Sequence, residues 1–115
     1  MRPITQKAGK SRRGKFTKAE SAYIERCVDF GCLACFCQTG QTKTLGMWHH
    51  QKEGYHAGGM RAPHFMGVCL CERHHMGKFG IHLNRAHFER HIGMTEGELV
   101  ALSQRMFNWK PSVTA

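Results

Sequence analysis

Apolar residues recur at helical spacing near the start of the chain, directly behind a helix-start signal. Thr17 and Glu20 fit a capping box, in which the N-cap and N3 side chains each bond the other's backbone N–H. Apolar residues follow at helical spacing as far as Phe30, and Gly31 stands where a glycine commonly ends a helix. The pattern therefore predicts a helix over residues 18–30.

Two further helices are predicted near the C-terminus. Asn84 can cap a short helix that runs through Ile92 and is closed by Gly93. A second capping box begins at Thr95. Behind it we expect an apolar helix face made of Leu99, Leu102, Met106 and Trp109. Pro111 should end this helix.

Between these helices the pattern is typical of short strands separated by loops. Residues 45–51 could form a short strand, and residues 65–70 are a short apolar run that could form a second one. Residues 38–46 have the composition of a turn or hairpin tip, and residues 53–64 are glycine-rich and polar, as in a loop. The order of a helix, two strands and further helices predicts an α+β fold.

Composition limits the class of protein. The chain has 115 residues, which indicates one small domain. Only 41% of the residues are hydrophobic, with no apolar run of the roughly 18 residues that a membrane span needs. The basic N-terminus lacks the apolar stretch of a secretory signal. We therefore expect a cytoplasmic protein without a membrane partner, in a compartment where clustered cysteines more often bind metal than form disulfides.

Basic charge is concentrated at the N-terminus. The net charge is +9, and residues 1–18 contain seven basic side chains and no acidic one. Residues 1–16 are predicted to be a flexible DNA-binding arm that contacts phosphates, with a solubilising tail as the alternative. Residues 17–110 should form the folded domain and residues 111–115 a short tail. The seven basic residues among residues 1–18 are Arg2, Lys7, Lys10, Arg12, Arg13, Lys15 and Lys18.

Two pairs of potential metal ligands flank the predicted strands. Cys32 and Cys35 form a CxxC pair after the first helix, and Cys71 and His74 form a CxxH pair after the second strand. Together they supply the four sulfur and nitrogen ligands of a structural Zn²⁺ site. Such a site would stabilise a domain too small to bury a large core.

The remaining cysteines leave some alternatives open. Cys27 falls on the apolar face of the first helix and is expected in the core. Cys37 could replace Cys35 as a ligand. Cys69 should face away from Cys71 only if the strand does not bend between them.

Histidines are also concentrated in this part of the chain. Neutral imidazole binds divalent metals and acts as a base near pH 7, so clustered histidines suit phosphodiester hydrolysis. His49 and His50 are adjacent on the first predicted strand and can serve one phosphate only where the strand bends or ends. His56, His87 and His91 are better explained as titrating surface residues.

This arrangement resembles the HNH endonucleases, also called ββα-metal or His-Me finger nucleases, with an embedded zinc site. It is most similar to the Ref-type phage nucleases, which enhance recombination and depend on RecA. The similarity covers roughly residues 20–105. The residues that carry it are Gly31–Cys35, His49–His50, Gly59–Phe65, Leu70–His75, Gly80–His82 and Phe88–Gly93.

The resemblance implies roles for individual residues. His50 matches the general base, and His64 matches the loop residue that supports the base or contacts phosphate. His49, His75 and His82 match ligands of a catalytic Mg²⁺ or Mn²⁺, although the long spacing from His75 to His82 departs from the family pattern. Cys69 stands where the family usually has an apolar residue or proline. Two further candidates for phosphate binding are Arg61 and Arg73.

The sequence thus predicts a small zinc-stabilised ββα-metal domain with an N-terminal helix, C-terminal helices and a disordered basic arm. The expected function is metal-dependent hydrolysis of DNA in phage or prophage recombination, on DNA that RecA could coat. The first alternative is a zinc-binding protein that recognises nucleic acid without cutting it. The second is a catalytically weak adaptor for RecA filaments.

Overall fold

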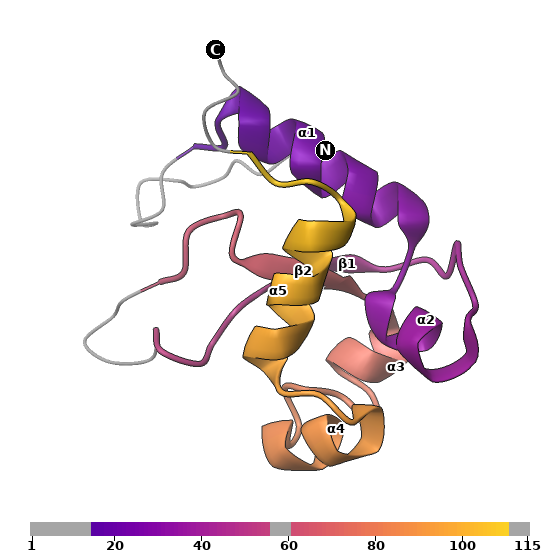
Figure 1. Cartoon of the computed structure of the whole chain (residues 1–115). Helices are drawn as coiled ribbons and strands as arrows, with labels where there is room; N and C mark the ends of the chain where they lie inside the picture. Colours follow the sequence, from indigo (N-terminus) through magenta and orange to yellow (C-terminus); the bar gives the residue numbers. More distant parts are fainter. Residues whose placement is uncertain (1–14, 56–60, 111–115) are drawn as a thin grey trace.

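The computed structural model describes residues 15–55 and 61–110, and these form an α+β fold of helices packed around one β-hairpin (Figure 1). Most of the proposed basic arm and the tail at 111–115 lie outside the described residues. No helix in the described ranges has both the length and the apolar character to cross a membrane. The elements in chain order are α1 (Lys18–Phe30), α2 (Leu33–Thr39), β1 (Met47–His50), β2 (Gly67–Leu70), α3 (Glu72–His75), α4 (Arg85–Ile92) and α5 (Glu96–Met106).

Helix α1 begins and ends where the sequence predicted. Thr17 Oγ1 accepts a hydrogen bond from Glu20 N over 3.0 Å, and Glu20 Oε1 accepts one from Thr17 N over 2.9 Å. The helix ends at Gly31, whose φ of +106° is strained for any residue with a side chain. A Cβ atom there would also lie 2.6 Å from Thr44 N, so Gly31 allows the chain to turn directly into the first cysteine pair.

Helix α2 was not predicted; it takes up the first two residues of the turn expected at residues 38–46, and the rest of that segment is irregular, as expected. Cys32 is its N-cap, with its Sγ accepting from Cys35 N over 3.4 Å, and the helix ends at Gly40 in the left-handed conformation. The helix has only seven residues, too few to show a clear apolar periodicity in the sequence. The CxxC pair is therefore held on one helical turn.

The two predicted strands pair as an antiparallel hairpin and are shorter than expected, with four residues each. All four residues of β2 are buried because the strand has a core on each face. Val68 and Leu70 pack in a cluster with residues of α2, α4 and α5, whereas Cys69 packs against α1. Because side chains alternate along a strand, this hairpin places consecutive residues in different parts of the molecule.

A glycine allows the two strands to pair closely. Gly67 is opposite His50 in the hairpin. A Cβ atom on Gly67 would lie 2.5 Å from His49 O and 2.7 Å from Trp48 Nε1, closer than atoms can approach. The pairing that fixes the position of His49 and His50 therefore requires a residue without a side chain.

The C-terminal helices begin as predicted, but α5 ends earlier. Asn84 caps α4, Gly93 ends it, and a complete capping box starts α5 at Thr95. Leu99 is buried, but α5 ends at Met106, which is 37% exposed, and Trp109 lies beyond the helix. Trp109 still packs, with its ring stacked on Phe65 at 4.7 Å between centroids. The last predicted turn of α5 is therefore not helical, and Trp109 is held by its packing against Phe65 instead.

Candidate metal centres

The four ligands predicted for zinc converge in the structure. Cys32 and Cys35 lie at the start of α2, Cys71 immediately precedes α3, and His74 lies within α3. One ligand atom of each lies within 4.8 Å of the others. Hairpin β1–β2 lies between the two pairs in the chain, so the fold that closes the hairpin also brings the ligands together. We call this group the Cys₃His cluster.

The distances within the Cys₃His cluster fit a tetrahedral zinc site. Cys35 Sγ and Cys71 Sγ are 3.8 Å apart. His74 Nδ1 lies 3.6, 3.7 and 3.3 Å from the sulfurs of Cys32, Cys35 and Cys71, respectively. Zinc–sulfur bonds of about 2.3 Å and zinc–nitrogen bonds of about 2.0 Å place tetrahedral ligands about 3.8 Å (S to S) and about 3.5 Å (S to N) apart. The residues are therefore placed as a zinc ion would require.

The protonation states of the Cys₃His cluster depend on whether a cation is bound. Burial raises the pKa of the Cys32 and Cys35 thiols, because a buried thiolate lacks solvation. A bound metal ion reverses this preference and holds the thiolates deprotonated. His74 Nε2 contacts Gln38 Oε1 at 2.9 Å, which requires Nε2 to carry the proton and leaves Nδ1 as the nitrogen that faces the sulfurs.

The structure settles the alternatives that the sequence left for the other cysteines. Cys37 is exposed and does not belong to the Cys₃His cluster, so it does not replace Cys35. Cys69 packs on the α1 side and Cys71 belongs to the other core cluster. Residues two apart in a straight strand would share a face, but β2 ends at Leu70 and Cys71 caps α3, so the chain leaves the strand between them, and the expected condition of an unbent strand is wrong. Cys27 is 1% exposed and belongs to the core, as predicted.

A second group consists of His49, His75 and His82, the three residues predicted to hold a catalytic metal. They come from β1, from α3 and from the loop after α3, and their ligand atoms lie within 4.8 Å of one another. His75 Nε2 and His82 Nε2 are 2.9 Å apart. Two ring nitrogens bound at right angles to one ion at about 2.1 Å would be about 3.0 Å apart. We call this group the His cluster.

Two imidazoles of the His cluster, those of His75 and His82, favour the neutral form that binds metals. Burial, together with the nearby His49, His82 and Lys52, lowers the pKa of His75 to about 4. Burial and His49 also lower the pKa of His82. His75 Nδ1 is buried and makes no hydrogen bond within the described part of the chain. At neutral pH these rings therefore offer lone pairs to a cation without first losing a proton.

Glu96 positions the His cluster, and sequence reasoning missed it. Its carboxylate is fully buried and lies 2.6 Å from His49 Nε2. It also accepts hydrogen bonds from the backbone N–H groups of Lys52 and Glu53 over 2.8 to 3.1 Å. Burial alone would raise the pKa of Glu96, but these hydrogen bonds outweigh it and hold the pKa below its usual range. The capping-box pattern drew attention to Glu98, and nothing in the sequence distinguished Glu96 from an ordinary first-turn glutamate.

His50, the predicted general base, is not a member of the His cluster. It is the last residue of β1, and its side chain contacts His64, with Nε2 and Nδ1 3.1 Å apart. One ring must donate and the other accept, so the two imidazoles share a proton. His64 is buried, its carbonyl accepts a hydrogen bond from Trp48 Nε1 over 2.8 Å, and Phe16 packs edge-on against its ring. The pairing of these two predicted residues is thus present, separate from the metal ligands.

The residues predicted to contact phosphate are only partly described. Lys15, Lys18, Arg61 and Arg73 are exposed, and the Arg73 guanidinium lies 5.3 Å from the centre of the Phe79 ring. The other predicted arm residues lie outside the described ranges. His87 and His91 are exposed and belong to neither cluster.

Three comparisons with known proteins identified no relative. No family model, no curated protein and no solved structure matches the chain. The chemical interpretation of the molecule therefore depends on the geometry of its own residues.

Proposed function

We propose that this protein is a metal-dependent DNA endonuclease of the HNH type. The observation that carries the proposal is the His cluster. Its three histidines were predicted from the sequence as ligands of one catalytic ion, and their ligand atoms lie within 4.8 Å of one another. Their distance from one another in the sequence, 26 residues from His49 to His75 and seven more to His82, makes this convergence informative.

In this proposal the His50–His64 pair supplies the general base. His50 takes a proton from the attacking water, and the water oxygen attacks phosphorus as the bond to the leaving oxygen breaks. His64 holds the His50 ring through the 3.1 Å contact and shares its proton. A divalent ion held by the His cluster would offset the phosphate charge and stabilise the leaving oxygen. The family resemblance implies Mg²⁺ or Mn²⁺, whereas a donor set of three imidazoles also suits Ni²⁺ or Zn²⁺.

The Cys₃His cluster has a structural role in this proposal. A metal ion bound by all four residues has no open coordination position for substrate, which is typical of structural zinc. Zinc bound there would hold the start of α2 against α3, and so keep His75 beside the hairpin. The basic residues at the N-terminus would add affinity for DNA without regard to sequence.

The test is a nicking assay on supercoiled plasmid with added Mg²⁺ or Mn²⁺. We expect the wild-type protein to cut, and His50→Ala and His49→Ala to lose cutting while keeping the wild-type affinity for DNA. His87→Ala, an exposed histidine outside both clusters, is the matched control and should cut normally. Cutting by His50→Ala would reject His50 as the base.

A second arm of the assay tests the recombination role. Single-stranded and duplex DNA are compared with and without RecA filament. We expect cutting to be strongest on RecA-coated DNA. Binding to DNA without cutting under every condition would favour the non-catalytic zinc protein or adaptor.

A further inference from the structure

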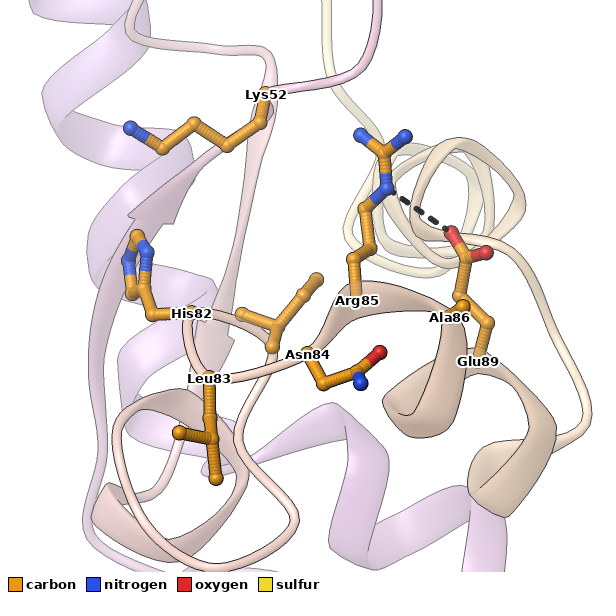
Figure 2. Close-up of a pocket in the computed structure, with 8 residues that line it drawn as sticks. Lys52, His82, Leu83, Asn84, Arg85, Ala86 and Glu89 are labelled. Carbon is orange, nitrogen blue, oxygen red and sulfur yellow. Dashed lines mark ion pairs between the residues drawn. The ribbon is translucent and has the colours of Figure 1, made fainter.

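A groove borders the His cluster, and nothing in the proposed reaction uses it yet (Figure 2). It has a volume of about 410 Å³, within the roughly 300–1,000 Å³ of ordinary ligand pockets. His82 belongs both to the groove and to the His cluster, so the two are continuous. The other lining residues are Lys52, Ile81, Leu83, Asn84, Arg85, Ala86 and Glu89.

Two cationic side chains border this groove from different elements. Lys52 follows β1 and is exposed, and no ion pair involves it within the described ranges. Arg85 is the first residue of α4 and is 42% exposed. Figure 2 shows Lys52 and His82 on one side of the groove and Arg85 on the other. A ligand lying in the groove would therefore meet a positive charge on each side.

The acidic groups nearby are less accessible than these cations. Arg85 lies 3.9 Å from a Glu89 oxygen and 3.7 Å from a Glu96 oxygen, too far for hydrogen bonds, so its N–H groups are not consumed by either. Glu89 accepts a hydrogen bond from Glu96 N over 2.7 Å, and Glu96 is fully buried. In Figure 2 the Arg85 side chain stands between Glu89 and the Lys52 side of the groove.

We propose that this groove binds a backbone phosphate of the nucleic-acid strand, with Lys52 and Arg85 as its anchors and His82 marking the path to the His cluster. The chemistry fits because a guanidinium offers a planar fork of donors and an ammonium offers a compact charge to phosphate oxygens. The groove is open, as continuous strands require. This inference rests on the proposed function, because the proposed nuclease activity is what would bring a nucleic-acid strand into the groove.

The test measures binding, so that it does not depend on cutting. A fluorescein-labelled oligothymidylate is titrated with wild type, Lys52→Met, Arg85→Met and Arg90→Met at several salt concentrations. Arg90 is the matched control, because it is an exposed arginine of α4 that does not line this groove. We expect Lys52→Met and Arg85→Met each to weaken binding roughly tenfold. Each should also reduce the salt slope by roughly 0.7.

Other outcomes would overturn the proposal. Equal losses in all three variants would mean that only general positive charge matters. Inorganic phosphate that binds in a Lys52-dependent way, with unchanged oligonucleotide affinity in Lys52→Met, would identify a free-phosphate site instead. Because Arg85→Met also removes two long ion pairs, Lys52→Met decides the result if the arginine variant loses its fold.

The groove and the nuclease activity can fail separately. Wild type that binds through Lys52 but never cuts would reject the endonuclease and leave the groove intact. Wild type that cuts, with unchanged oligonucleotide affinity in both groove variants, would reject the groove alone.

Discussion

Glu96 lies 2.6 Å from His49, and this contact joins the first turn of α5 to the end of β1. A buried carboxylate that contacts one ring nitrogen of a metal-ligating histidine fixes the orientation of the ring and increases its basicity. Its backbone partners, Lys52 N and Glu53 N, fix the carboxylate in turn. His49, one of the three residues of the His cluster, is thus oriented by main-chain groups as well as by a side chain.

Replacing Glu96 by Gln should weaken metal binding at the His cluster. The amide keeps the shape but loses the charge, so we expect roughly a 10- to 100-fold loss of affinity for Mn²⁺, measured by calorimetry on protein with zinc already bound. Glu98→Gln is the control, since Gln also completes a capping box at the same helix end. Equal affinities in the two variants would mean that Glu96 only stabilises the fold.

Removing zinc should unfold much of the domain. Cys71→Ser, or treatment with a strong chelator, should lower the melting temperature measured by circular dichroism and release one zinc per chain. Cys37→Ser changes an exposed thiol outside the Cys₃His cluster and should melt as wild type does. If Cys71→Ser and Cys37→Ser melt alike with unchanged metal content, the cluster does not hold a structural metal.

The hydrogen bond between Tyr23 and Ser103 should contribute measurably to stability. Tyr23 Oη and Ser103 Oγ are 2.9 Å apart between α1 and α5, and both side chains are fully buried. Tyr23→Phe should lower the unfolding free energy by about 1 kcal/mol in denaturant titrations, since it leaves the hydroxyl of Ser103 with fewer partners. A double-mutant cycle with Ser103→Ala isolates the pair, and a coupling energy near zero would contradict this account.

A methyl group at position 67 should disrupt the hairpin. Gly67→Ala places a Cβ 2.5 Å from His49 O, so the strands must move apart, and a loss of about 1–3 kcal/mol is expected. Gly97→Ala is the comparison, because its Cβ would meet only Glu53 Oε1 at 3.5 Å and alanine favours the helix. Chemical denaturation should therefore show opposite signs for the two variants; matching losses would refute the close approach.

The sequence predicted those parts of the fold whose signals are local. Two capping boxes, the glycines at helix ends and the Cys and His spacings predicted α1, α4, the start of α5 and the four residues that could hold zinc. It missed α2, whose seven residues are held by the Cys32 cap and by packing. It also missed Glu96, because the burial of a helix-start carboxylate depends on contacts with Lys52 and His49, more than 40 residues away.

The short helix α3 limits how this chain could vary. His74 contributes to the Cys₃His cluster, whereas its neighbour His75 contributes to the His cluster, and the helix has only one turn. Each residue added to a helix rotates the next side chains by about 100°. A single insertion or deletion between Cys71 and His75 would therefore misdirect one imidazole or both, so among homologous chains this segment should keep a constant length.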